Sequence, residues 1–499
     1  MKSLFEKDFR SLFFPEKPIS VKMALPLFAA TVGFYLWVKL GCHELWKDEW
    51  QAWHVARDMS WAKMFQFLYY EGHPSLWYVY LKLVTYITPS GLDLYALQIA
   101  HAMLLLCAFA LLFFRFRFHI LLKLAGAFSY FCFFEYGMVN RGYALLIVLA
   151  FIAVDLLNRK GKNELWLALV LVLLCQTEAQ GVLIAGALTI FIFTEKLLEE
   201  GLLSALKNTG NQLLLGAFTT GLLLFIASVY PRGEAEDLAR AYNMMKQPLS
   251  ESIPVAYQGL LANTFWIGSI ADTGANGVQL AGLLLSTLIL GMLIYLFSTE
   301  KRVLTTLIAG LLAFFAFAAF VYGGGVRQWG LLFVLFVILL QLFAQSGASL
   351  NALKAAFLIS VFGFQLFYCS LAVGKDIKYP FSNAEKTADF ITTNVPQKVP
   401  VVAINPFENG AVTGYLGKER KVYTMPSGEP YTWFKWLSKV YIPTEGELKL
   451  FAQYKGVGGI VVLTAAPLPT DRFPNATLWK RFDSYSIKNE NFYLYTLPK

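Results

Sequence analysis

The sequence carries very little charge for its length. Of its 499 residues, 15% are charged and 57% are hydrophobic, and the mean hydropathy is +0.52. This composition excludes an ordinary soluble globular protein and predicts a chain that crosses a membrane several times. The net charge of +9 would suit nucleic acid, but the lysines and arginines are scattered in short connections between apolar runs. The positive-inside rule explains that placement, so we expect membrane lipids and no nucleic acid as partners.

Cysteine and histidine are also scarce. The five cysteines lie in or at the ends of apolar segments without CxxC or Cys/His spacing, so no disulfide framework is predicted. Three of the five histidines, His43, His54 and His73, share one region with Glu71. Their spacing fits no standard zinc site. We therefore expect no metal and no cofactor, and a divalent metal ion is the alternative.

The N-terminal region lacks the features of a cleavable signal peptide. Residues 1–22 are charged and rich in phenylalanine, and no Ala-x-Ala site ends the first apolar run at about 23–42. That run is long enough to cross about 30 Å of hydrocarbon and is expected to remain as an anchor. The N-terminus is expected in the cytoplasm because basic residues precede this run, namely Lys2, Lys7, Arg10, Lys17 and Lys22.

Eleven spans are predicted within a transmembrane domain of residues 1–374. The apolar stretch 73–88 is not counted, because a span there would invert every later basic loop. It is predicted instead as an interfacial helix, anchored by Trp77, Tyr78, Tyr80 and Lys82, in a first outer loop of residues 43–93. The approximate spans are 23–42, 94–114, 120–138, 142–157, 164–175, 181–195, 212–230, 278–298, 303–322, 328–345 and 353–373.

The composition changes near Lys375, and residues 375–499 have the charge and turn density of a soluble domain. The predicted elements are helices at 382–394 and 445–454, strands at 399–404 and 459–463, and a terminal hairpin at 478–497. The topology places this small α/β domain on the extracytoplasmic side. It contains no cysteine, which suits a bacterial inner membrane protein. A longer outer loop at 231–277 ends in a Gly/Asn/Asp-rich stretch and is expected to be partly irregular.

The first outer loop contains two adjacent carboxylates, Asp48 and Glu49, and, further along, Glu71 and His73. Ionisable groups near a bilayer are costly, and a pair of acids there indicates function. The alternative is that both acids are solvated loop charges beside an interfacial belt of tryptophans.

The predicted topology collects most other polar candidates on the same side. Arg141 and Arg327 lie at span ends, where a guanidinium suits bidentate binding of a phosphate whose lipid tail stays in the bilayer. Snorkelling to ordinary headgroups is the alternative. Glu135 is expected either to pair with Arg141 or to reach the headgroups, and Glu178 either to line a site or to be solvated. Arg57 and Gln180 are further binding candidates on this side.

A carboxylate pair beside phosphate-binding arginines suits one reaction. A general base can deprotonate an acceptor while a lipid phosphate leaves the anomeric carbon of a sugar, and cations stabilise the departing charge. Adjacent residues point in different directions, so one acid is expected to be the base and its neighbour to orient the acceptor.

These residues resemble the GT-C superfamily of integral-membrane glycosyltransferases, in the branch with protein O-mannosyltransferases and the lipid A aminoarabinose transferase. The similarity covers about residues 20–345. It consists of the acidic pair Asp48-Glu49 after the first span, the step Gly72-His73-Pro74, the motif Arg141-Gly142-Tyr143 in the second outer loop, and the late Arg327.

The resemblance implies a GT-C-like fold, a polyprenyl-phosphate-linked sugar donor, an inverting single displacement and a base in the first outer loop. It carries over to Asp48 as the base, with Glu49 as the competitor. Tyr143 stands where some members have an acid, so the sugar and the acceptor, whether lipid, glycan or protein, are not implied.

Two other functions remain alternatives. A transporter or flippase of a lipid-linked glycan would predict charges within the middle of spans and repeat symmetry between the halves of the chain, and neither is clear here. The other alternative is an inactive relative that presents its α/β domain as a binding module.

Overall fold

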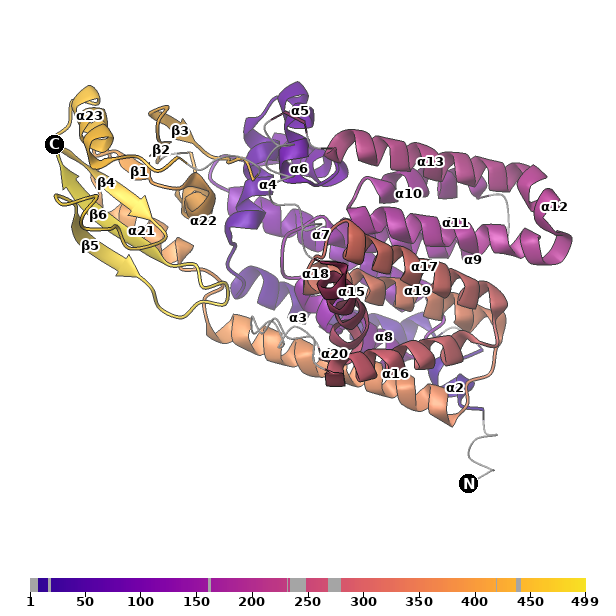
Figure 1. The fold of residues 1–499 in the computed structure, drawn as a ribbon. Coiled ribbons are helices and arrows are strands. Elements are labelled where there is room, and N and C mark those ends of the chain that lie inside the picture. The colour runs from indigo at the N-terminus through magenta and orange to yellow at the C-terminus, as the bar shows by residue number, and fades with distance from the viewer. Residues whose placement is uncertain are drawn as a thin grey trace.

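The computed structural model describes residues 8–16, 19–159, 163–230, 232–233, 248–267, 280–418, 420–436 and 441–499. They form a helical bundle with a sheet domain at one end, which we call the sheet end (Figure 1). Within these residues, eight helical segments are long and apolar enough to cross a membrane. They are α3 (Val21–Gly41), α7 (Asp93–Arg115), α11 (Ala179–Glu200), α13 (Thr209–Val229), α16 (Leu280–Phe297), α17 (Lys301–Phe320), α18 with α19 (Val326–Trp329 and Leu331–Ser346) and α20 (Ala352–Lys378).

The other three predicted spans are shorter or broken. Two form the apolar helices α9 (Tyr143–Asn158) and α10 (Glu164–Cys175). The expectation of one continuous helix at 120–138 is wrong, because this segment divides into α8 (Ile120–Ala127) and the π-helical η1 (Tyr130–Glu135). Ser129 makes the break. Its Oγ donates to the carbonyl of Gly126 at 2.7 Å and accepts from the N–H of Cys132 at 3.3 Å, which begins a new helix.

The predicted first outer loop folds into three helices at the sheet end, α4 (Lys47–Asp58), α5 (Trp61–Glu71) and α6 (Leu76–Ile87). Ser60 caps the start of α5, and Gly72 ends it at φ +66°, a left-handed conformation that suits glycine. Helix α6 is the helix expected after His73. Its residues Trp77, Tyr78 and Lys82, however, are buried in the protein instead of anchoring an exposed interfacial helix.

Part of the predicted loop at 231–277 is helical. Helix α15 (Leu249–Gln258) continues into the π-helical η3 (Gly259–Ile267), which packs against α16 and α20. Gln365 of α20 donates to the carbonyl of Thr264 at 2.8 Å, so this segment is fixed to the bundle. The Gly/Asn/Asp-rich stretch at 271–277 lies outside the described residues.

The sheet domain contains a six-stranded sheet of order β3-β2-β1-β4-β6-β5. Its three central parallel strands are β1 (Val401–Ala403), β2 (Val422–Thr424) and β4 (Gly459–Thr464), and its antiparallel strands are β3 (Glu429–Tyr431), β5 (Thr477–Phe482) and β6 (Phe492–Pro498). The helices are α21 (Ala384–Asn394), α22 (Pro406–Leu416) and α23 (Glu445–Tyr454). The predicted helices, strands and terminal hairpin are all present, and α22, β2 and β3 are additional.

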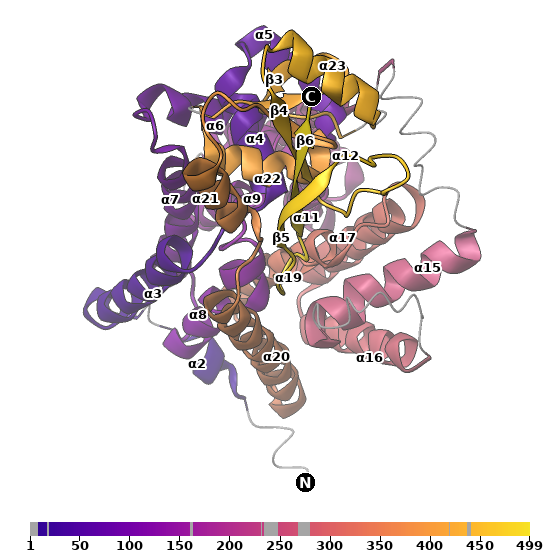
Figure 2. The same ribbon diagram turned by 90° about the vertical axis from the view of Figure 1, so that its left-hand side faces the viewer.

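Alternate residues of the central strands face two different apolar cores. Val402 and Val462 pack with α23, whereas Val401 and Val461 pack with α21 and α22. The second core is continuous with the buried residues of α4, α5 and α6, including Trp50. Figure 2, which looks onto the sheet end, shows α21 and α22 in front of these helices. The sheet domain is therefore fixed to the first-loop helices by a shared apolar core.

Helices α22 and α4 approach each other closely at Gly414 and the buried indole of Trp50. A Cβ added at Gly414 would lie 2.2 Å from Cδ2 of Trp50. No side chain fits there without moving the two helices apart.

We expect Gly414→Ala to lower the free energy of unfolding by about 1–3 kcal/mol, the usual cost of overpacking a core. The matched control is Gly446→Ala in α23, where the nearest atom to an added Cβ lies 4.0 Å away. Thermal unfolding of both variants in detergent checks this. Equal unfolding midpoints would show that the α4–α22 contact does not stabilise the fold.

Candidate active site

Asp48, in the first turn of α4, lies between two arginines that come from distant parts of the chain. Its Oδ2 accepts a hydrogen bond from Nη1 of Arg141 at 3.0 Å and lies 3.9 Å from Nη1 of Arg327. Its Oδ1 is buried and makes no hydrogen bond within the described part of the chain. The carboxylate is thus fixed through one oxygen while the other has no partner.

Arg141 is held from its other side by a histidine and an acid. Its Nη2 donates to Nε2 of His73 at 2.8 Å, and Nδ1 of His73 lies 2.8 Å from Oε2 of Glu178. Because a guanidinium only donates, Nε2 is the acceptor and Nδ1 carries the proton that bonds to Glu178. The chain Glu178–His73–Arg141 therefore orients the guanidinium toward Asp48.

Arg327, in α18, has an acid partner of its own. Its Nε donates to Oε1 of Glu135 at 2.5 Å, and the hydroxyl of Tyr130 donates to Oε2 of Glu135 at 3.0 Å. The expectation that Glu135 pairs with Arg141 or reaches the headgroups is wrong, because η1 directs Glu135 toward α18. The Nη groups of Arg327 make no hydrogen bond with the described residues, so they remain available to a ligand.

Glu49 points away from this cluster and is fully buried. Its Oε1 accepts from both the backbone N–H and the side-chain Nδ2 of Asn140, each at 2.6 Å, and Oε2 accepts from the N–H of Trp46 at 3.0 Å. Burial opposes its charge, but the hydrogen bond and charge of His43 lower the pKa of Glu49 to about 2. Glu49 therefore anchors α4 to the residue that precedes Arg141.

His43 lies between Glu49 and a carboxylate of the last long helix. Its Nε2 is 3.5 Å from Oε1 of Glu49, and its Nδ1 is 3.0 Å from Oδ2 of Asp376. Burial disfavours the imidazolium, but these two acids outweigh it, Asp376 more strongly, and raise the pKa of His43 to about 9. A protonated His43 thus balances two buried carboxylates.

Of the other predicted site residues, Arg57 and Gln180 lie outside the charged cluster, and Tyr143 borders it. Arg57 bonds to Asp58 at 2.7 and 2.8 Å and to Asp93 at 3.0 Å. The buried Tyr143 lies near Arg141, Arg327 and Glu178, and its hydroxyl accepts a hydrogen bond from Nε2 of Gln328 at 3.4 Å. Gln180 is buried in the first turn of α11, and no hydrogen bond with a described residue connects its side chain to the cluster.

Glu71 belongs to a buried group that lies beside His73 and Arg141 and joins the first loop to the sheet domain. It accepts from Nε2 of Gln51 at 2.6 Å and from the hydroxyl of Tyr78 at 2.9 Å. Burial raises its pKa, although these two hydrogen bonds oppose the rise. The amide of Gln51 also bonds to both backbone groups of Phe434, at 2.6 and 3.1 Å, so Glu71 supports the attachment of the sheet domain.

Several residues of this site were not found from the sequence as site residues. Asn140 immediately precedes Arg141 and was overlooked because an asparagine at a span end has many ordinary explanations. Asp376 was not singled out within the predicted domain of residues 375–499, and His43 was considered only as a zinc ligand. The sequence contained a weak indication of all three residues, because each is an unusual polar group at the end of an apolar segment.

Within the part of the chain that the structure describes, no group of three or more His, Cys, Asp and Glu side chains is arranged to hold a metal ion. His54 stacks on Trp50 with ring centroids 5.6 Å apart, while His43 and His73 bond to different acids. The expectation that the protein uses no metal stays a prediction.

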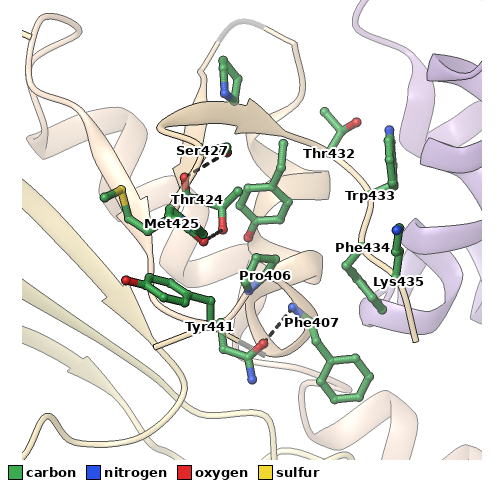
Figure 3. A pocket seen from close by; sticks show the side chains of 14 residues that line it. Pro406, Phe407, Thr424, Met425, Ser427, Thr432, Trp433, Phe434, Lys435 and Tyr441 are labelled. Carbon is green, nitrogen blue, oxygen red and sulfur yellow. Dashed lines mark hydrogen bonds between the residues drawn. The ribbon is translucent and has the colours of Figure 1, made fainter. Parts of the chain in front are cut away.

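The sheet domain has a cavity of its own, of about 460 Å³ (Figure 3). It lies beyond the carboxyl ends of β1 and β2 at the start of α22, and Phe407, Phe434 and Tyr441 are among its lining residues. None of its lining residues belongs to the Asp48 cluster. It is therefore a separate cavity from the charged site.

The helical bundle, the first-loop helices and the terminal sheet domain define a polytopic helical membrane protein with a GT-C-like fold. The chain is similar to two solved structures of ArnT from Cupriavidus metallidurans. With the one bound to undecaprenyl phosphate, the TM-score is 0.52, with 10% identity over 96% of this chain and 98% of that chain. With the apo state, the TM-score is 0.54, with 10% identity over 95% and 98%.

No family model matches the sequence, and no curated protein matches it. At 10% identity, the structural likeness establishes the fold and leaves the roles of individual residues to their geometry.

The buried His43 makes the stability of the protein depend on pH. Its pKa in the folded protein is about 9, above its ordinary value of 6.5, so its protonation favours the folded state. This contribution is complete below about pH 6.5 and is lost as the pH rises through about 9. We expect the unfolding midpoint in detergent to fall between about pH 6.5 and pH 9 in the wild type and to fall less in His43→Gln.

His119→Gln is the control for this experiment, because His119 caps α8, away from these acids. It should keep the full pH dependence of the wild type. If His43→Gln kept it as well, the buried imidazolium would not be the cause.

Proposed function

We propose that this protein is a glycosyltransferase that moves one sugar from a polyprenyl-phosphate-linked donor to an acceptor. The observation that carries the proposal is the position of Asp48 between Arg141 and Arg327 at the sheet end of a GT-C-like bundle. A base and two phosphate-binding cations are the groups that this transfer needs. The structure of ArnT with undecaprenyl phosphate supports a polyprenyl phosphate as the carrier.

Asp48 is the proposed general base. Oδ2 is held by Arg141, and the unpartnered Oδ1 is the oxygen that accepts the proton of an acceptor hydroxyl or amine. The acceptor atom then forms a bond to the anomeric carbon on the face opposite the phosphate. The bond between this carbon and the phosphate oxygen breaks, its electron pair leaves with the polyprenyl phosphate, and the configuration inverts.

Arg327 and Arg141 are the proposed phosphate ligands. Arg327 uses only its Nε–H on Glu135, so its two Nη groups can form a bidentate pair with phosphate oxygens. Arg141 keeps N–H groups beyond those that bond to Asp48 and His73. Both guanidiniums can therefore neutralise charge as it develops on the leaving phosphate.

Glu49, in this scheme, is a positioning residue. Its two hydrogen bonds to Asn140 connect the start of α4 to the loop that carries Arg141. This connection sets the distance between the base and its guanidinium partner. His73 and Glu178 have the same role on the opposite side of Arg141. The scheme assigns no step to a metal ion.

We also propose that the sheet end faces the extracytoplasmic side of a bacterial inner membrane and that the N-terminus is cytoplasmic. Basic residues at the other end support this orientation. Arg115 and Arg159 both bond to Asp155 at the ends of α7 and α9, and Arg302 bonds to Glu195 near the start of α17. Cytoplasmic connections carry such an excess of arginine and lysine.

Asp48→Asn should reduce sugar transfer by about 10²–10⁴-fold, the usual contribution of a general base, while expression and membrane insertion stay normal. The assay follows release of undecaprenyl phosphate from a panel of undecaprenyl-phosphate-linked sugars by the purified protein in liposomes, in the presence of a panel of lipid, glycan and protein acceptors. Asp389→Asn, an exposed acid on α21, is the control and should be fully active. Full activity of Asp48→Asn would exclude it as the base, and no release from any donor would exclude the enzyme class.

Arg327→Gln should weaken binding of undecaprenyl phosphate by about 10–100-fold, the range for a lost hydrogen bond to a charged group. The control is Arg302→Gln, which removes an arginine paired with Glu195 at the opposite end of the bundle. Titration with ligand-induced thermal stabilisation measures both variants. Equal affinities would show that Arg327 does not contact the phosphate.

A further inference from the structure

The turn of the terminal hairpin reaches from the sheet domain to the charged cluster. Figure 1 shows the loop between β5 and β6 extending from the sheet toward the bundle. The N–H of Ile487 donates to the carbonyl of Pro380, and the N–H of Lys488 to the carbonyl of Phe381, each at 3.0 Å. These two bonds fix the turn against the segment that follows α20.

Lys488, at this turn, lies on the same tryptophan as Arg327. Its ammonium is 4.6 Å from the ring centroid of Trp46 and 5.3 Å from that of Phe381. The guanidinium carbon of Arg327 is 5.6 Å from the Trp46 centroid, so the two cations are separated by at most about 10 Å, the sum of 4.6 and 5.6 Å. Residues more than 150 positions apart in the sequence thus bring two like charges to one ring.

These two cations repel each other, and among the described residues no acid lies within ion-pair distance of Lys488, although Glu135 is near enough to attract it. Its ammonium makes no ion pair and no hydrogen bond with any residue in the described ranges, only the two ring contacts. Burial and the nearby Arg327 lower the pKa of Lys488, and the attraction of Glu135, Asp48 and Glu49 opposes this change. Lys488 is half-buried and has no direct ion-pair partner among the described residues, so an anion bound between Lys488 and Arg327 would relieve the repulsion of the two cations.

The turn is held in a strained but well-supported conformation. Asn489 has φ +51°, and it is the one non-glycine residue in the left-handed region among those the structure describes. Glu490 accepts from Oγ of Ser382 at 2.7 Å, and Nδ2 of Asn383 donates to the carbonyls of Ser484 and Glu490 at 2.8 and 3.1 Å. Strain of this kind persists where the surroundings fix a functional group in place.

We infer that Lys488 is a third cation of the donor-phosphate site, so that the sheet domain supplies a ligand to the phosphate. This inference rests on the proposed function. Its ligand class is a lipid phosphate whose charge lies between Lys488, Arg327 and Arg141. Loss of the sugar converts a phosphodiester into a more highly charged phosphomonoester, so a third cation binds the leaving group more strongly than the intact donor.

The test measures binding of undecaprenyl phosphate and of the uncharged alcohol undecaprenol by ligand-induced thermal stabilisation. Lys488→Met keeps an unbranched side chain on Trp46 and removes the charge, and Lys488→Arg restores the charge. Lys480→Met is the matched control, because Lys480 is an exposed lysine that also lies over an aromatic ring, that of Phe390, at 6.0 Å.

Undecaprenyl phosphate should raise the unfolding midpoint of the wild type and of Lys480→Met. Undecaprenol should raise the midpoint of neither protein above its value in detergent alone. Lys488→Met should bind the phosphate about 10-fold more weakly, because it loses one charge-assisted hydrogen bond, and Lys488→Arg should bind within about 3-fold of the wild type. If Lys488→Met does not fold, Lys488→Gln replaces it as the uncharged variant in this test.

Two results would contradict the inference in distinguishable ways. If Lys488→Met bound undecaprenyl phosphate as tightly as the wild type, Lys488 would only pack on Trp46 and the inference would fail alone. If the wild type did not prefer the phosphate to the alcohol, the phosphate site of the proposed function would fail with it.

Discussion

The structure depends on keeping buried charges neutralised by partners from distant parts of the chain. A carboxylate removed from water without a partner costs several kcal/mol, and the acids around Asp48 avoid this cost only because α4, the Arg141 loop, η1 and α18 meet at one place. Asp48 and Arg141 cannot be placed independently, because Glu49 joins α4 to Asn140 beside that arginine. The ion network and the packing of the helices thus determine each other.

The sequence was sufficient for most of the architecture. Length and apolarity predicted the long helices, and a serine cap or β-branched runs predicted α21, β1 and β4. The break at Ser129 was missed because hydropathy averages over a window and does not register one side chain that bonds to its own backbone. Helix α22 was missed because Gly410 and Gly414 lower its propensity, and the reason for Gly414 is the indole of Trp50, which only the tertiary structure reveals.

The candidate site was predictable as residue types on one side of the membrane, but its pairings were not. Polarity at span ends drew attention to Asp48, Arg141 and Arg327, and the structure brings all three together. Which acid pairs with which arginine depends on the π-helical turn at Glu135, for which the sequence has no rule. The contribution of the turn at Lys488 was equally invisible, because a lysine in a polar turn is ordinary until its neighbours in space are known.

The apolar core shared by α4–α6 and the sheet has a consequence for biogenesis. Strand β6 pairs with the central strand β4, and it follows every membrane helix in the chain. The sheet that buries Trp50 therefore closes only after the last helix has been threaded into the bilayer. Until then the first-loop helices leave an apolar face uncovered, so chaperone recognition and proteolytic quality control have a defined interval in which to act on the nascent protein.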